Sequence, residues 1–469
     1  MKITQLYQTY ESLINTVVTV NGWVQTIRSQ KGISFIKLVD GSNSTGVQLV
    51  AEGEFSELDQ VTTGSSMCAN GLLVKSPAEG QLFEIKIIAV KIYGLAEPTD
   101  YPLAKGKLPL DYLRTYPHLR TRTQTFGSVF RIKSAISNAT QKFYQGKGFL
   151  HVNPNIITIN ECEGGAGVFQ ITERDISYPN ALPTETIKTE DGKHIITTNK
   201  YDWIQDHFEK PAYLTVSSQL QLEALCCSLG SVYTTNKSFR SEHSTTNKHL
   251  SEFEHLEIED AFITLDELMQ TGEDYIKFVG NYLLEYCMDD ITNLSKFVSK
   301  GLFERIKTIT TTKFIRLQYT DAIELLKKAT LSKPVLFGDD LSAEMENYLT
   351  DHFNGPVFVT HWPIAIKSFY MKQCDSGLCE NFDLLMPYKV GELIGGSMRE
   401  DNLDRLLDVM KVKGVSPEPL QFYLDLRKFG SVPHGGFGLG LDRMCMMFTG
   451  MESIKDVVAF PVFYKNCRM

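Results

Sequence analysis

The sequence has no apolar run long enough to span a bilayer, and its first residues lack the apolar core of a secretory signal. It also lacks a positive balance of charge, because the formal net charge is −9. A generally basic nucleic-acid-binding protein is therefore excluded, although a local basic face is not. We expect a cytoplasmic protein with no membrane partner.

The nine cysteines form neither a zinc-ligand pattern nor a disulfide framework. Cys226 and Cys227 are adjacent, and only Cys374 and Cys379 come as a near pair. We interpret the cysteines as reduced residues that mostly fill the core. Internal repeats and low-complexity segments are also absent, which excludes solenoid and disordered architectures.

What is present is the composition of an ordinary globular protein, with 42% hydrophobic and 22% charged residues in a chain of 469. That length predicts more than one domain. The first domain, residues 1–97, shows short strand patterns separated by turn signals, and these predict a closed barrel of the OB-fold type. The expected strands are 16–27, 33–39, 46–50, 71–74 and 82–90.

Four barrel residues are candidates for contact with unpaired bases. Phe35, Gln48 and Glu84 lie within strands, and Arg28 lies next to the first turn. An aromatic ring with nearby polar groups can stack on a base and read its edge. The alternative is that Phe35 belongs to the core, which is the commoner fate of a single strand phenylalanine.

Residues 98–125 are rich in proline and in basic side chains and predict a hinge. The hinge either lies near a nucleic-acid backbone or is a solvated connector. The second domain is expected over 126–469, with insertions at about 173–210 and 290–355. The first insertion is interpreted as ordered or as a mobile loop over a site.

The stretch from Phe239 to Glu259 predicts a strand, a polar loop and a second strand. Such a hairpin places Arg240 and Phe253 on one face, where a guanidinium suits a phosphate and a ring suits a base. A charged surface hairpin is the other reading. Elsewhere, an apolar stripe from Ser128 predicts a helix ending at Gly146.

Polar side chains and glycines mark two further regions as candidates for contact with a ligand. Ser217 and Ser218 suit a helix N-cap, after which Gln219 and Glu223 lie four residues apart on one helical face. Glycine-rich segments follow at 391–399 and at 432–449, the second running from a strand into a helix. Glycines at such positions let a ligand approach the backbone.

Taken together, three elements resemble the motifs of the class II aminoacyl-tRNA synthetases. They are the helix and strand of 128–167, the R-x-E…F hairpin of 240–253 and the G-F-G-L-G-L-D-R of 436–443. The barrel resembles the anticodon-binding domain of the aspartyl, asparaginyl and lysyl subgroup. C-E-G-G-A-G, L-T-V-S-S-Q-L-Q-L-E, K-S-F-Y-M and G-E-L-I-G-G-S-M-R are similar to stretches of its asparaginyl branch.

The resemblance implies an α+β fold in which the N-terminal OB-fold barrel precedes a catalytic domain built on an antiparallel sheet flanked by helices. It implies a homodimer that activates L-asparagine with ATP and Mg²⁺ and transfers it to the 3′-terminal ribose of tRNA(Asn). It assigns anticodon binding to the barrel residues Arg28, Phe35, Gln48 and Glu84.

The same resemblance implies roles for individual residues. The catalytic arginines are Arg240, on the α-phosphate, and Arg443, and the ATP-binding set is Arg240, Glu242, His249, Leu250, Phe253, Glu392 and Arg443. The Mg²⁺ carboxylates are Asp383 and Glu392, and the amino-acid contacts are Glu163, Gln219, Glu223 and Arg399.

Glu223 favours asparagine, because a buried glutamate beside an aspartate carboxylate would bring like charges together. The alternatives are an aspartyl enzyme of relaxed specificity, a relative that has lost aminoacylation, and an ammonia-dependent asparagine synthetase. The chain departs from the family at Pro154, one place early, and at Lys248, where an arginine is usual.

Overall fold

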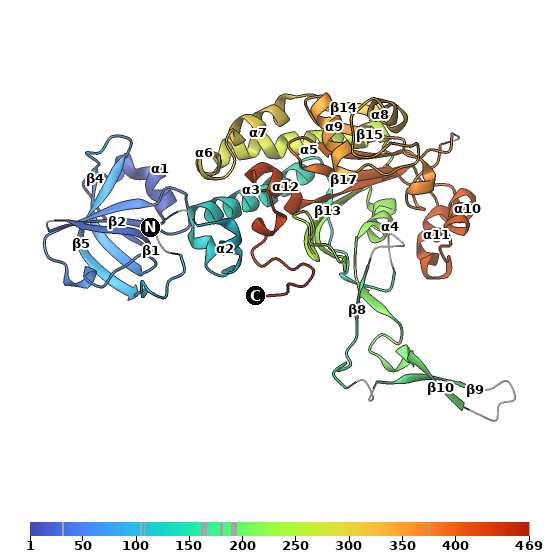
Figure 1. The fold of residues 1–469 in the computed structure, drawn as a ribbon, viewed down its shortest axis with the longest axis horizontal. Helices are drawn as coiled ribbons and strands as arrows, with labels where there is room; N and C mark the ends of the chain where they lie inside the picture. Colours follow the sequence, from blue (N-terminus) through green and yellow to red (C-terminus); the bar gives the residue numbers. More distant parts are fainter. Residues whose placement is uncertain are drawn as a thin grey trace.

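The computed structural model describes the chain except for residues 31, 104–105, 107, 161–166, 179–181, 189–194, 375 and 469. It consists of a small N-terminal barrel beside a larger α+β domain, from which a two-stranded arm projects (Figure 1). Within the described part of the chain, no helix is both long and apolar enough to span a membrane.

The barrel is closed in the strand order β1-β2-β3-β5-β4, which confirms the predicted five-stranded unit. Its strands are β1 (Val17–Gln30), β2 (Ile33–Val39), β3 (Val47–Glu52), β4 (Ser66–Lys75) and β5 (Phe83–Gly94). Alternate residues such as Ile36 and Leu49 are fully buried inside it. Helix α1 (Ile3–Leu13), which was not predicted, adds Ile3 and Leu6 to this core.

Two basic residues of the hinge, Arg114 and Arg120, turn inward and pair within the protein, whereas Arg122 is exposed. Arg114, at the end of α2 (Leu110–Arg114), donates to both carboxylate oxygens of Asp456, at 2.8 and 2.6 Å. Arg120 is fully buried and donates to backbone carbonyls that include those of Lys455, at 3.0 Å, and Ala459, at 3.3 Å. Burial lowers the pKa of Arg120 to about 10. These cations join the hinge to the C-terminal segment.

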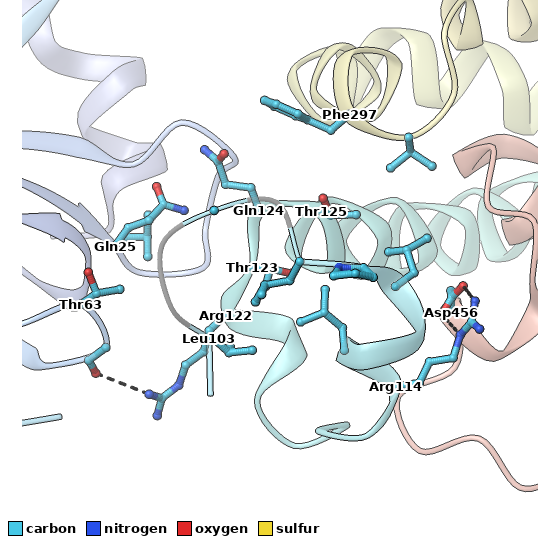
Figure 2. A pocket seen from close by; sticks show the side chains of 18 of the residues that line it. Gln25, Thr63, Leu103, Arg114, Arg122, Thr123, Gln124, Thr125, Phe297 and Asp456 are labelled. Atoms are coloured by element: carbon cyan, nitrogen blue, oxygen red, sulfur yellow. Dashed lines mark hydrogen bonds and ion pairs between the residues drawn. The ribbon is translucent and has the colours of Figure 1, made fainter. Parts of the chain in front are cut away.

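A cleft of about 1000 Å³ separates the barrel from the hinge and the larger domain (Figure 2). Gln25 and Thr63 line its barrel side, and Arg114 and Asp456 lie at the opposite side. Gln124 bridges the two domains through a 2.9 Å hydrogen bond from its Nε2 to the carbonyl of Ser44.

The larger domain is built on an eight-stranded sheet in the order β14-β15-β16-β17-β18-β13-β12-β6. It is antiparallel through its centre, as predicted, but the outermost pair at each edge is parallel. The strands are β6 (Leu150–His151), β12 (Ser231–Phe239), β13 (Glu252–Ala261), β14 (Ile315–Gln318), β15 (Val357–Thr360), β16 (Asn381–Met386), β17 (Gly391–Met398) and β18 (His434–Gly440).

One face of this sheet is covered by helices. They are α3 (Gln124–Gly146), α5 (Leu265–Tyr286), α6 (Met288–Phe297), α7 (Leu302–Thr311) and α12 (Leu441–Thr449). Helix α3 begins four residues before the predicted Ser128, because Thr123 caps it. Gly272 of α5 lies close to Ile394 and Phe437, so the side chains of these strands on that face point into the core.

The opposite face of the sheet remains open for a site. Because strand side chains alternate, Asp383 and Gly395 face away from the core that holds their neighbours Leu384 and Ile394. Helix α4 (Gln219–Leu229), α10 (Leu403–Lys413) and α11 (Gln421–Lys428) lie toward this side (Figure 1).

The two expected insertions differ in structure. The first contains β9 (Thr184–Lys188) and β10 (Ile195–Tyr201), which form the arm and point away from the domain rather than over it (Figure 1). The second contributes α8 (Tyr319–Leu326), α9 (Ala343–His352) and the edge strand β14 to the main fold. A small sheet of β7 (Ile157–Thr158), β11 (Ala212–Leu214) and β8 (Phe169–Ile171) connects to the arm.

Candidate active site

The open face of the sheet carries a cleft of about 530 Å³. Six of the predicted site residues line it: Gln219, Arg240, Glu242, Asp383, Glu392 and Arg399. Glycines keep the floor open, since a Cβ on Gly438 would lie only 2.6 Å from His255 Nε2. A Cβ on Gly436 would likewise lie 2.3 Å from Glu259 Oε1. The glycine-rich motif thus makes room for polar side chains of the neighbouring strand as well as for a ligand.

The hairpin formed by β12 and β13 places an arginine and an aromatic ring together, as predicted. Arg240 directly follows β12, and its backbone N–H donates to the carbonyl of Ser251 at 3.0 Å. Its guanidinium carbon lies 5.6 Å from the centre of the Phe253 ring. The cation is therefore fixed at the cleft, with the ring as a flat apolar wall beside it.

The loop between these strands is tied back to the domain. Lys248 Nζ donates to the carbonyl of Val390 at 3.0 Å, and burial lowers the pKa of Lys248. His249 Nε2 lies 3.5 Å from the Glu242 carboxylate. Leu250 packs in the core, so any contact of this residue with ATP would come from its main chain.

Arg443 lies in the first turn of α12 and donates to the backbone carbonyl of Glu392. This bond joins the third motif to the strand that carries one of the two predicted metal carboxylates. Neither Arg443 nor Phe253 is among the residues that line the cleft in this structure.

Two carboxylates converge above Gly395. A Cβ there would lie 3.2 Å from Glu392 Oε1 and 3.7 Å from Asp383 Oδ1. Burial raises the pKa of Asp383 to about 6, an effect that Lys367 opposes through a 2.7 Å ion pair and Glu392 reinforces. A cation between these oxygens would relieve that cost.

The donor set fits Mg²⁺, which proteins usually bind through one or two carboxylates together with substrate phosphates. Among the described residues, no group of three or more His, Cys, Asp or Glu side chains could hold a metal ion. The pair Asp383 and Glu392 therefore fits an ion that is completed by a nucleotide rather than a closed structural site.

The far end of the cleft is built around Arg399. Its Nε lies 3.2 Å from each carboxylate oxygen of Glu259, and its Nη1 donates to Ser397 Oγ at 2.7 Å. Burial raises the pKa of Glu259 to about 7, although Arg399 opposes this effect and Glu223 adds to it. The guanidinium charge is thus largely matched by a carboxylate of the protein.

Glu223 lies behind the cleft rather than in its lining. It is fully buried, and its partners are Gln219, Tyr423, Arg427 and His434. Burial alone would raise the pKa of Glu223, but Arg427, His434 and Arg399 together outweigh it and hold that pKa below its usual range. Glu163, the other predicted amino-group contact, lies outside the described residues.

The predicted serine cap of α4 is only partly correct. Ser217 Oγ accepts from the backbone N–H of Gln219 at 3.2 Å, but the Ser218 hydroxyl makes no capping bond. The N–H of Ser218 instead donates to the Glu257 carboxylate at 3.0 Å. An anion at the start of a helix also complements the helix dipole.

Sequence reasoning missed several residues that line the cleft, and those with charged side chains are Glu257, Glu259 and Lys367. The first two follow Phe253 at even steps along β13, so the two-residue period of a strand already placed them on the same face. Lys367 directly follows a 3₁₀ helix and lies in no helix or strand itself. No periodic pattern therefore predicted its ion pair with Asp383.

On the barrel, the strand register brings the four candidate residues to one outer face. Arg28 pairs with Phe35 across β1 and β2, and the β3–β5 register places Gln48 beside Glu84. Phe35 is 41% exposed, so the core alternative is wrong. Glu84 is buried and accepts from Gln48 Nε2 at 3.2 Å, which orients the amide.

Comparison with known families matches both domains. Residues 110–463 match the family described as tRNA synthetases class II (D, K and N), and residues 18–93 match the OB-fold nucleic acid binding domain. These matches define a class II synthetase of the aspartyl, lysyl and asparaginyl group that carries an OB-fold domain.

Curated relatives narrow the assignment. The asparagine–tRNA ligase of Nostoc sp. is 41% identical over 95% of this chain and 94% of its own length. That of Desulfitobacterium hafniense is also 41% identical, over 99% and 98%. The solved asparaginyl-tRNA synthetase of Pyrococcus horikoshii, complexed with asparaginyl-adenylate, superposes with a TM-score of 0.82 at 29% identity, covering 97% of each chain. The chain belongs to the class II D, K and N synthetases and, within them, to the asparagine–tRNA ligases.

Proposed function

We propose that the cleft is the place where this asparagine–tRNA ligase joins asparagine to AMP and then passes the asparaginyl group to tRNA(Asn). The observation that carries the proposal is the convergence of three groups in one cleft: Arg240, the Asp383–Glu392 pair and the Arg399–Glu259 pair. Arg240 provides a cation for a phosphate, the Asp383–Glu392 pair provides ligands for a metal ion, and the Arg399–Glu259 pair provides polar groups for a small side chain.

The first step needs positioning and charge rather than a covalent intermediate with the protein. A carboxylate oxygen of asparagine attacks the α-phosphorus of ATP, the bond to the bridging oxygen breaks, and pyrophosphate leaves. Arg240 binds the α-phosphate and stabilises the charge that shifts onto its oxygens. Phe253 and Arg443 hold the adenine between them, Glu242 lies near the adenosine or the 3′-terminal nucleotide of tRNA, and His249 lies near the distal phosphates. Mg²⁺, when bound by Asp383 and Glu392, supplies further positive charge to the phosphates.

In the second step, a hydroxyl of the terminal ribose of tRNA attacks the activated carbonyl. The bond to the phosphate oxygen breaks, AMP leaves, and the hydroxyl proton is released. Gln219 holds the α-amino group of asparagine, with Glu163 as its second partner. Glu223 and Arg399 select the side-chain amide. No protein side chain is assigned as a general base.

Amino-acid-dependent pyrophosphate exchange tests the function. Asparagine is expected to drive exchange, whereas aspartate and lysine are not, because the buried carboxylates near Arg399 disfavour a second anion and the Arg399 guanidinium, which donates to an amide oxygen, repels an ammonium group. Exchange driven equally by aspartate would overturn the choice of amino acid. Exchange without charging of tRNA(Asn) would overturn the transfer step.

We also propose that the chain is a homodimer that pairs along the β6 edge of the sheet. Apolar side chains of β6 and of the segment that follows it are exposed: Leu150 by 48%, Ile157 by 47% and Ile159 by 43%. Exposed apolar side chains beside an edge strand are typical of a protein–protein interface. Sedimentation equilibrium at micromolar concentration is expected to give twice the mass of one chain, and a monomer mass would contradict the proposal.

For the barrel, we expect Phe35→Ala to weaken charging of tRNA about 10- to 100-fold, because stacking on a base contributes roughly 1–3 kcal/mol. The loss should appear as a higher KM for tRNA, while asparagine-dependent exchange stays unchanged. Val17→Ala is the control, since Val17 is exposed near the other end of β1. Equal effects of the two substitutions would contradict a role for Phe35 in RNA binding.

A further inference from the structure

A buried chain of charges leads from helix α11 to the side-chain end of the cleft. Arg427 donates from Nη2 to Glu223 Oε2 at 2.7 Å, and both side chains are fully buried. Glu223 Oε1 lies 3.8 Å from Arg399 Nε, and Arg399 is paired with Glu259. The sign of the charge therefore alternates from α11 to the cleft.

The two oxygens of Glu223 are used unequally. Oε2 accepts from Arg427 and from the Tyr423 hydroxyl at 2.7 Å, and it lies 3.0 Å from His434 Nε2. Because a carboxylate oxygen has about two lone-pair sites, this side is saturated. Among the residues that the structure describes, Oε1 has one hydrogen-bond donor, Gln219 Nε2 at 3.0 Å, and it is the oxygen on the side of the residues that line the cleft.

We propose that Arg427 is a positioning residue for the choice of amino acid. It holds Glu223 ionised and saturates Oε2, so that Oε1 is left to accept from the side-chain amide of asparagine. The inference rests on the proposed function, because it assigns a supporting role at the amino-acid end of that cleft.

Arg427 is suited to this role because its guanidinium contributes most to offsetting the burial of Glu223, with His434 at the same oxygen and Arg399 nearer the other. Its Nε donates to the backbone carbonyl of Glu400 at 2.9 Å, and its guanidinium carbon lies 3.9 Å from the centre of the Tyr423 ring. The planar cation is thus fixed at several points. In the described part of the chain, the titratable groups that face Glu223 are Cys226 and Cys227 on α4, Glu259 on β13, Arg399 after β17, Tyr423 and Arg427 on α11, and His434 on β18.

The arrangement explains why an amide is preferred to a carboxylate. Two guanidiniums, those of Arg399 and Arg427, face two carboxylates, those of Glu223 and Glu259, so in the described part of this end of the cleft each cation is already matched by an acid of the protein. An aspartate side chain would meet an ionised Glu223 with no spare charge to match it, whereas an amide N–H can donate to Oε1.

The test uses the full-length enzyme with Arg427→Met, which removes the charge and keeps most of the volume. In pyrophosphate exchange we expect the KM for asparagine to rise about 10- to 100-fold, the effect of losing a bond to a charged group. The kcat and the KM for ATP should change by less than about 3-fold. Lys428→Met is the matched control, because Lys428 is an exposed cation on the same helix.

The pH profile separates positioning from a merely structural role. Without Arg427, burial raises the pKa of Glu223, so lowering the pH from 8.5 to 6 protonates it and further raises the KM for asparagine. The parent enzyme and Lys428→Met share any change that comes from Glu259, whose pKa burial raises to about 7, so the expected signature is the additional rise in KM of Arg427→Met over both. Arg427→Lys, which keeps the charge, should recover the parent profile and part of the affinity.

If Arg427→Met shows the same KM for asparagine and the same pH profile as Lys428→Met, the inference is overturned. If Arg427→Met does not fold, the double variant E223Q/R427M removes both buried charges and is expected to fold and to lose the preference for asparagine over aspartate. Parent-like preference in the double variant would also overturn it. If the parent itself gives no exchange with asparagine, the proposed function fails, and not only the role of Arg427.

Discussion

Arg240→Ala is expected to lower asparagine-dependent pyrophosphate exchange by about 10³-fold or more, as happens when a cation that stabilises a phosphoryl transition state is removed. Arg240 lines the cleft, follows β12 directly and lies against the Phe253 ring. Its charge matters most as negative charge moves onto the phosphate oxygens, so kcat should fall more than the affinity for ATP.

The matched control is Lys237→Ala. Lys237 is a cation on the same strand, but it pairs with Glu252 at 3.3 Å and does not line the cleft. Its loss should leave exchange within about 2-fold of the parent, as for a surface ion pair. Thermal unfolding of both variants should match that of the parent. Near-normal exchange by Arg240→Ala would refute the assignment of this residue to the α-phosphate.

Asp456→Asn is expected to lower the free energy of unfolding by about 3–5 kcal/mol, the usual cost of removing one partner of a buried ion pair. Asp456 is fully buried, receives two hydrogen bonds from Arg114 and lies 3.6 Å from Arg120 Nη1. Asparagine keeps the shape but removes the anion, so the fully buried Arg120 loses its nearest counter-charge.

Urea denaturation measures this effect, with Asp266→Asn as the control. Asp266 pairs with Arg316 at 2.8 Å, but its side chain is 78% exposed, so this substitution should cost less than about 1 kcal/mol. Equal losses in the two variants would contradict the role of Asp456. Asp456 joins the hinge to the C-terminal segment. We therefore expect its substitution to affect the earliest transition in the urea curve, and the free energy of unfolding is measured from that transition.

Local patterns predicted the elements whose residues determine one another over short distances. The turn signals bounded the five barrel strands, the apolar stripe gave α3, and the hairpin brought Arg240 and Phe253 together. In the same way, the four-residue step from Gln219 to Glu223 predicted a contact that exists as a 3.0 Å hydrogen bond.

Patterns failed where the partner lies far away in the chain. Arg120 looked like a cation for nucleic acid, but its partners begin 335 residues later, at Lys455. Glu223 was predicted to share a helical face with Gln219, but no nearby residue predicted that Arg427 and His434, more than 200 residues away, enclose its other oxygen. The exposure of Phe35 depends on barrel closure, which no single strand encodes. The sequence therefore identified the charged residues, but it did not predict which distant groups surround them in the fold.

The alternating charges from Arg427 to Glu259 come from four separate elements, and this limits how the enzyme can evolve. Changing any one member leaves a neighbour's charge buried and uncompensated, which costs stability before it changes selectivity. A lineage that moves to another amino acid must therefore alter at least two distant positions together. We expect substitutions at Glu223 and Arg427 to be strongly epistatic, each harmful alone and tolerated in combination.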